Sequence, residues 1–144
     1  NPLIDLELCN KLIHEYDSGD FDYVSYSFNR EPTITFDHGI YCEIVSLKAL
    51  NKALKLSVKQ EYLEHVTSYI YNNTDKFRIK FLEAEDIWKT ISPQRLTIDT
   101  EEDLSRIKNI FKHLNPLEYS FNKYLNKLNN DINFYNLNKP GIKK

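Results

Sequence analysis

The stretch Gln94–Phe111, QRLTIDTEEDLSRIKNIF, decides the fold of this chain. Its short apolar run, Leu96–Ile98, predicts a strand that stops at Asp99. Thr100 can cap a helix that starts at once, because its side-chain oxygen can accept free amide hydrogens of the first turn, and Asp103 completes an acidic variant of the capping box. Apolar residues then recur at helical spacing: Leu104, Ile107, Ile110 and Phe111. The stretch therefore predicts a strand, a turn and a capped helix in immediate succession.

Asp99 is the residue of this stretch with a predicted chemical role. It is expected at the carboxyl end of the strand and before a helix of about Glu101–Leu114, where open α/β sheets place their ligands. A carboxylate there can hold a metal ion against a phosphate. Aspartate before a helix is also common as a simple cap, so spacing alone favours a structural role. The acids Glu101, Glu102 and Asp103 are assigned to capping and solvation, since the helix dipole favours negative charge in the first turn.

The amino-acid sequence around Asp99 favours the metal-binding role. Arg95–Leu104, RLTIDTEEDL, resembles the metal-site segment of the cytidylyltransferases that activate acidic and cell-surface sugars. The resemblance is greatest to the cytidylyltransferase-like proteins of spore coat polysaccharide biosynthesis, and more distant to acylneuraminate and 3-deoxy-manno-octulosonate cytidylyltransferases. It continues upstream in the same order, with a Glu-His-Val-Thr segment typical of the spore coat branch. The upstream segments are Asn1–Asp5, Asp22–Ser25, His38–Leu50 and Glu64–Tyr71.

This resemblance implies a fold and a set of site residues. The fold is an α/β, partial Rossmann-like nucleotidyltransferase fold with a mixed sheet and flanking helices, over residues 1–114, followed by a helical tail over residues 115–144. Asp99 is expected to bind Mg²⁺. Four residues are expected to bind substrate: Tyr41, Glu43, His65 and Arg95. Arg95 is expected either to contact an anionic group or to pair with an acidic side chain. Strand alternation places Glu43 on one face with Tyr41, a face that is not freely polar, so Glu43 is expected either half-buried beside the acceptor sugar or exposed to solvent.

The same resemblance implies a function. The expected reaction is the transfer of CMP from CTP to a sugar or sugar acid for surface polysaccharide biosynthesis, by a cytoplasmic homodimer. The family's Gly-rich triphosphate loop has no counterpart among Gly19, Gly39 and Gly141, and its first metal aspartate would precede Asn1. We therefore expect this chain to be the C-terminal part of such an enzyme and to be inactive as a fragment. The alternative is a non-catalytic sugar-binding or dimerisation module of a degenerate or truncated member.

Composition limits the other possibilities. The chain has 144 residues, which suits one ordinary domain, and 41% of them are hydrophobic. A net charge of −2 offers no basic stripe for nucleic acid, and no apolar run reaches the length of a membrane helix. Cys9 and Cys42 show no metal-site spacing and are expected as free thiols in a reducing compartment.

Hydrophobic periodicity predicts the remaining elements. An apolar helix face runs from Leu6 to Tyr16, and Gly19 is expected to end that helix. Further predictions are a strand at Phe21–Phe28, an arm or hairpin at Arg30–Asp37, a strand at Ile40–Val45, a helix from a Ser46 cap to Leu56, a helix at Gln60–Tyr71, an edge strand at Lys76–Glu83 and a connection at Glu83–Pro93 with Trp88. In the tail, a helical stripe of Leu117, Phe121, Tyr124, Leu125 and Leu128 must be covered by its own domain or by a partner chain, before a polar terminus from Asn129.

Overall fold

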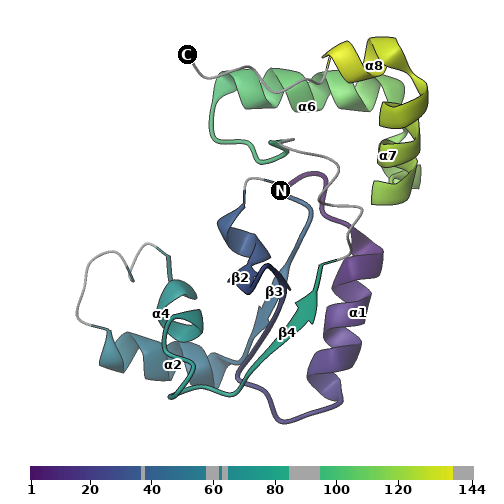
Figure 1. Cartoon of the computed structure of the whole chain (residues 1–144). Helices are drawn as coiled ribbons and strands as arrows, with labels where there is room; N and C mark the ends of the chain where they lie inside the picture. Colours follow the sequence, from purple (N-terminus) through teal and green to yellow (C-terminus); the bar gives the residue numbers. More distant parts are fainter. Residues whose placement is uncertain (37, 58–61, 63–64, 85–94, 138–144) are drawn as a thin grey trace. The chain divides into compact units, whose positions relative to one another are not determined.

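The structure is a computed structural model, and it describes residues 1–36, 38–57, 62, 65–84 and 95–137 (Figure 1). The contacts divide the chain into two compact units. One, here called the helical unit, comprises Asn1–Glu7, Phe36–Tyr41 and Glu85–Lys144. The other, the sheet unit, comprises Leu8–Thr35 and Cys42–Ala84. The predicted connection with Trp88 lies outside the described residues.

The sheet unit is built around a central strand. β1 (Tyr23–Phe28) pairs antiparallel with β2 (Glu31–Pro32) and β3 (Glu43–Val45), and parallel with β4 (Ile79–Glu83). A small mixed sheet with flanking helices is thus confirmed. The strand expected over Ile40–Val45 is shorter than predicted, because only its last three residues pair with β1.

Of the arm or hairpin predicted over Arg30–Asp37, the first part is confirmed as a hairpin, because β2 pairs with β1 across a tight turn. Asn29 and Arg30 connect β1 to β2, and their φ angles are 51° and 69°. Two successive left-handed residues give a type I′ turn, whose twist matches that of the paired strands. Arginine is an unusual occupant of the second position, since a side chain makes left-handed backbone costly.

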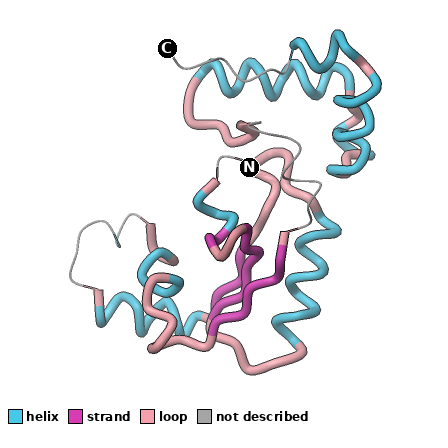
Figure 2. The backbone as a smooth tube through the Cα atoms, viewed as in Figure 1, coloured by secondary structure: helices cyan, strands magenta, loops and turns pink. Residues whose placement is uncertain are grey.

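Helices cover both faces of this sheet, as the tube in Figure 2 shows. On one face lies α1 (Leu6–Asp17): the Tyr26 hydroxyl of β1 donates to the Leu8 carbonyl at 3.2 Å, and Lys80 of β4 pairs with Glu15 at 3.4 Å. On the other lie α2 (Leu47–Leu56) and α4 (Ser68–Tyr71). Their core with β1 consists of Tyr23, Ala49, Ala53, Tyr69, Ile70 and Phe77. Burial on both faces explains why β1 carries five buried residues in succession.

Two helix predictions in this unit have different outcomes. The Ser46 cap is confirmed, because its side chain accepts the Ala49 amide at 3.0 Å. Among its described residues, the long helix expected at Gln60–Tyr71 is confirmed at Tyr62 and Ser68–Tyr71 but wrong at His65–Thr67. His65–Thr67 forms a turn, and only the four residues of α4 follow as helix. The Ser68 amide donates to the His65 carbonyl at 2.9 Å, which closes a turn where a continuous helix would bond four residues back.

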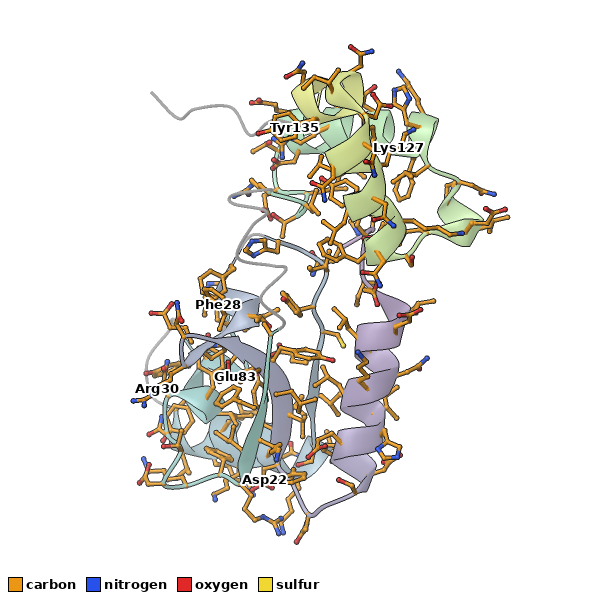
Figure 3. All side chains as sticks on the ribbon, turned by 45° about the vertical axis from the view of Figure 1, so that its right-hand side comes forward. Asp22, Phe28, Arg30, Glu83, Lys127 and Tyr135 are labelled. Atoms are coloured by element: carbon orange, nitrogen blue, oxygen red, sulfur yellow. The ribbon has the colours of Figure 1, made fainter. Side chains whose placement is uncertain are left out.

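The helical unit contains α6 (Glu101–His113), a 3₁₀ turn η2 (Pro116–Glu118), α7 (Phe121–Asn130) and α8 (Ile132–Leu137). Helix α8 lies in the terminus predicted to be polar, and it buries Phe134. The Phe134 ring meets those of Tyr124 and His113 edge-on, with centroids 5.9 and 5.7 Å apart. Lys127 lies over the same ring, 5.6 Å from its centroid, and Figure 3 labels it together with Tyr135 of α8.

The tail stripe is covered within its own chain. Four of the five predicted members are buried: Phe121, Tyr124, Leu125 and Leu128. Leu117 is wrong as a member, because it lies in η2, before α7 begins, and is 95% exposed. The buried Asp5 carboxylate accepts the Phe121 amide at 2.8 Å, and the Tyr119 hydroxyl donates to the Leu3 carbonyl at 2.9 Å. The N-terminal segment therefore anchors the tail.

Among the described residues, no helix has the length and apolar character needed to cross a membrane.

Candidate functional site

The segment before Asp99 is held without strand pairing. Leu96 is buried, but residues 95–98 form no strand with any described residue. The predicted strand at Leu96–Ile98 is therefore not present. An apolar run becomes a strand only where a neighbour supplies ladder hydrogen bonds. Here the segment packs instead against Gly39, whose φ is +67°. A Cβ on Gly39 would lie 2.7 Å from the carbonyl carbon of Leu96, so only glycine allows this close approach.

The helix after Asp99 is confirmed with its cap. α6 starts at Glu101, and the Thr100 side chain accepts the Asp103 amide at 3.2 Å. Asp103 reciprocates by accepting the Thr100 amide at 3.0 Å, which completes the capping box. The Asp99 side chain is 62% exposed. The sequence therefore places an accessible carboxylate directly before a well-fixed helix terminus.

The burial and the number of hydrogen bonds of Asp103 exceed what its sequence position predicted. Its role in capping is confirmed, but it is not solvated, because its side chain is only 3% exposed. One oxygen, Oδ2, accepts the amides of Asp99 and Thr100 and the Thr100 hydroxyl, at 3.2, 3.0 and 2.9 Å. Burial alone would raise the pKa of this carboxyl, but these hydrogen bonds and the Arg95 charge together lower it well below its usual range.

Two arginines complete the network around Asp103. Arg95 Nε donates to Asp103 Oδ1 at 3.2 Å, and its Nη2 donates to Asp99 Oδ2. Arg106, one turn after Asp103, pairs with the same Oδ1 at 3.2 Å and donates to the Arg95 carbonyl at 2.7 Å. Arg95 was predicted as a substrate residue from the sequence, whereas Arg106 was given no role. The i,i+3 spacing of Asp103 and Arg106 is the signal that could have found it.

The sheet unit holds a second engaged carboxylate, that of Glu43. The Tyr23 hydroxyl donates to its Oε2 at 2.6 Å, and the Thr67 hydroxyl donates to its Oε1 at 3.0 Å. Three elements meet here: β1, β3 and the turn before α4. Glu43 is half-buried, and of the two burial states left open by the sequence this is the one found. Its place beside an acceptor sugar stays a prediction.

The charge of Glu43 influences the tyrosines around it. Burial, and then the nearby Glu43 charge, raise the pKa of Tyr23 far above its ordinary value. The same two causes, in the same order, raise the pKa of Tyr71. Both phenols therefore stay protonated at neutral pH, and Tyr23 remains a hydrogen-bond donor to Glu43.

The other predicted site residues have different surroundings. His65 is exposed in the turn that carries Thr67, so Thr67 rather than His65 contacts Glu43. Tyr41 is buried and belongs to the helical unit, outside β3. The structure therefore brings Arg95 and Asp99 together in one unit, and places Glu43 and His65 in the other.

The two cysteines are free thiols, as predicted. Burial, and next a hydrogen bond with Cys9, raise the pKa of Cys42 to about 12. Such a thiol carries little thiolate at neutral pH, and a nucleophilic role for Cys42 has no support.

Asp99 fits the donor type that Mg²⁺ prefers. Magnesium is usually bound by one or two carboxylates, with water and substrate phosphate as the other ligands. Arg95 engages Oδ2 of Asp99, while Oδ1 has no partner among the described residues. Those residues contain no cluster of three or more His, Cys, Asp or Glu side chains able to hold a metal. Asp99 would therefore act as a single protein ligand within the described chain.

Comparison with known proteins adds to this geometry. Over 116 residues the chain is 34% identical to the spore coat polysaccharide biosynthesis protein SpsF of Bacillus subtilis, an alignment that covers 78% of this chain and 44% of SpsF. The chain is a distant homologue of SpsF. It is also 31% identical over 138 residues to the uncharacterized protein MJ1063 of Methanocaldococcus jannaschii, with 96% of this chain and 54% of that protein covered.

The chain spans about half the length of the curated relatives it matches. No family model and no solved structure matches the chain. The comparisons thus relate the chain to a protein of polysaccharide biosynthesis, in agreement with the coarser part of the sequence-based interpretation.

Proposed function

We propose that this chain forms the sugar-side and second metal-ligand part of a nucleotidyltransferase, which transfers CMP from CTP to a sugar or sugar acid for surface polysaccharide biosynthesis. The observation that carries the proposal is the presentation of Asp99. Its carboxylate is exposed, while the main chain around it is fixed by Gly39 on one side and by the α6 cap on the other. Distant homology to SpsF supports the biological setting.

In this reaction a sugar oxygen attacks the α-phosphate of CTP, and pyrophosphate leaves. Asp99 would hold Mg²⁺, which when bound neutralises phosphate charge. Arg95 can offer its guanidinium to a phosphate oxygen, because it already reaches the exposed Asp99 carboxylate and a guanidinium suits phosphate geometry. The chain's own contribution is mainly to position these groups.

On the acceptor side, Glu43 is proposed to bind sugar hydroxyls. An ionised carboxylate offers about four acceptor positions, of which Tyr23 and Thr67 use one on each oxygen. The remaining positions can accept hydroxyl hydrogens of a sugar. His65, exposed in the neighbouring turn, is proposed as a further hydrogen-bond donor. The substrate-binding role of Tyr41 stays a prediction, since its side chain is buried in the helical unit.

A chimera tests the catalytic proposal. In it, this chain replaces the 116-residue segment of SpsF that it matches, and pyrophosphate release is measured with CTP, Mg²⁺ and a panel of neutral and acidic sugars. We expect turnover by the chimera and none by the 144-residue chain alone. Asp99→Asn should reduce turnover at least a hundredfold, with Glu102→Gln as the matched control. Equal turnover of the Asp99→Asn chimera and its parent would contradict the metal-ligand role.

The alternative is a non-catalytic sugar-binding module. It is favoured by one observation, that the Glu43 network is complete within the sheet unit. It predicts sugar binding by the chain without turnover by any chimera. Saturation-transfer NMR with Glu43→Gln as the comparison distinguishes the binding module from the enzyme.

A homodimer remains part of either proposal. Because the α7 stripe is already covered, we propose the β1–β2 hairpin as its contact, to be checked by light scattering of Arg30→Glu.

A further inference from the structure

We propose that Asp103 is the positioning residue of the metal site, fixing both the main chain and, through Arg95, the carboxylate of Asp99. This inference rests on the proposed function of Asp99. The sequence and the comparisons give Asp103 no role beyond capping its helix.

The first argument is the direct hold on the main chain. Asp103 Oδ2 accepts the Asp99 amide at 3.2 Å, in addition to the Thr100 amide that an ordinary capping box uses. Asp99 lies outside α6, so this bond contributes nothing to the helix ladder. It fixes the orientation of the residue that carries the proposed ligand.

The second argument is the hold on the side chain. Arg95 spans both aspartates, with Nε on Asp103 and Nη2 on Asp99. Arg106 in turn fixes Arg95, since it donates to the Arg95 carbonyl at 2.7 Å while pairing with Asp103. The two buried partners, Asp103 and Arg106, are 3% and 12% exposed, whereas Asp99 is 62% exposed. A rigid interior thus ends in one accessible carboxylate.

The third argument is a contrast with other helices of the chain. α2 and α7 are capped by Ser46 and Ser120, each through a serine hydroxyl that accepts one amide, and the Phe121 amide of α7 also donates to the Asp5 carboxylate. The residues at their N3 positions, Ala49 and Lys123, cannot form an acidic capping box. The 10-residue helix α2 therefore forms with a serine cap in place of an acidic capping box. The additional groups at α6 are explained by the need to orient Asp99.

Metal-induced line broadening in NMR tests the inference on the 144-residue chain. Mn²⁺ alone is titrated as the probe, and apparent affinity is read from amides around Asp99. The unaltered chain should show local broadening that Asp99→Asn abolishes. Asp103→Asn and Arg106→Gln should weaken the apparent affinity at least threefold, and Arg106→Lys should restore part of it. Thr100→Ala and Ser120→Ala are matched controls, since they remove a cap but leave the bond from the Asp99 amide to Asp103.

Stability and affinity separate the possible outcomes. If Asp103 only caps the helix, Asp103→Asn and Thr100→Ala will lower the melting temperature alike and leave Mn²⁺ affinity of the folded chain unchanged, which overturns the inference. If Asp103→Asn does not fold, unchanged affinity in Arg106→Gln has the same consequence. Absence of any broadening that depends on Asp99 in the unaltered chain overturns the proposed function itself, and the inference with it. Broadening that Asp99→Asn abolishes but Asp103→Asn leaves intact overturns the inference alone.

Discussion

The helical unit and the sheet unit each hold a carboxylate network, but with opposite chemistry. In the helical unit, the buried Asp103 is bound by two arginines, which balance its charge, while the exposed Asp99 is engaged by Arg95 at one oxygen. In the sheet unit, the described partners of Glu43 are the neutral hydroxyls of Tyr23 and Thr67. Cationic partners fix a carboxylate strongly and cancel its field, whereas neutral donors orient it and leave its charge available.

This difference indicates what each network can do. Breaking one partner of a buried ion network leaves an uncompensated charge, so the helical unit depends strongly on Asp103. Removing one neutral donor costs less, because the carboxylate retains its other partner and some water. The helical network therefore suits rigid positioning, and the Glu43 network suits contact with a polar ligand.

The largest expected effect comes from breaking the cationic network. Asp103→Ala removes the shared partner of Arg95 and Arg106 and should lower the unfolding free energy by about 3 kcal/mol. Hydrogen exchange should locate the loss in α6 and the segment before it. Denaturant unfolding with Glu102→Ala as the control measures it, and a loss equal to that of the control would contradict the role of the buried ion network.

The corresponding change in the sheet unit should cost less. Glu43→Gln keeps an acceptor for one hydroxyl but turns an amide donor toward the other, and should cost about 1 kcal/mol. Tyr23→Phe with Glu43→Gln should cost less than the sum of the single changes, since the two residues share one hydrogen bond. A double-mutant cycle checks this. Additive effects would show that the bond between Tyr23 and Glu43 contributes nothing to stability.

Alkaline pH should weaken both units through their buried tyrosines. Burial raises the pKa of Tyr124 in the helical unit, and burial followed by the Glu43 charge raises that of Tyr23 in the sheet unit. A raised folded pKa stabilises below the unfolded value of about 10, and this stability is lost as pH rises further. Each tyrosine should remove about 1.4 kcal/mol per pH unit above pH 10. In urea unfolding from pH 8 to 11, the unfolding free energy should fall less steeply with pH in Tyr124→Phe than in the unaltered chain. An equal fall would contradict the raised pKa of Tyr124.

The smallest expected effect is a gain. Arg30→Gly should stabilise the sheet unit by about 0.5 kcal/mol, because Asn-Gly is preferred in the type I′ turn that Asn29 and Arg30 form. If the two units unfold separately, only exchange in β1 and β2 should slow. If they unfold together, protection of α6 should rise equally, which would sharpen the comparison between the units. Asn29→Ala, which places alanine in left-handed backbone, should act in the opposite direction.

Local patterns predicted much of the fold because their causes are local. Thr100 and Ser46 were predicted as caps from the residues that follow them, and both are confirmed. The strand at Leu96–Ile98 was wrong, because pairing depends on a distant neighbour that periodicity does not show. The long helix over Gln60–Tyr71 was wrong at His65–Thr67 for a related reason: Thr67 turns toward Glu43, which lies 24 residues earlier.

The site was predicted in part. Asp99, Glu43 and Arg95 were named from the sequence, but the other residues that contact these carboxylates were given no role. Thr67 and Arg106 act through contacts across elements, and a single sequence shows only that they are polar. Asp103 was assigned to capping and solvation because the helix dipole favours negative charge in the first turn, whereas two arginines make its burial favourable here.

The division of the chain has a consequence for the order of synthesis. The chain passes from one unit to the other after Glu7, Thr35, Tyr41 and Ala84. The sheet unit is therefore finished when the ribosome has made Ala84, whereas the helical unit needs both its first residues and its last helices. The Asp5 carboxylate bonds to the Phe121 amide, and the Leu3 carbonyl bonds to the Tyr119 hydroxyl. Each bond joins residues 116 positions apart, so neither can form before the later residue has been made. Nascent-chain force profiling should thus detect the sheet unit folding first, and the helical unit completing its fold only after Tyr119 and Phe121 have been made.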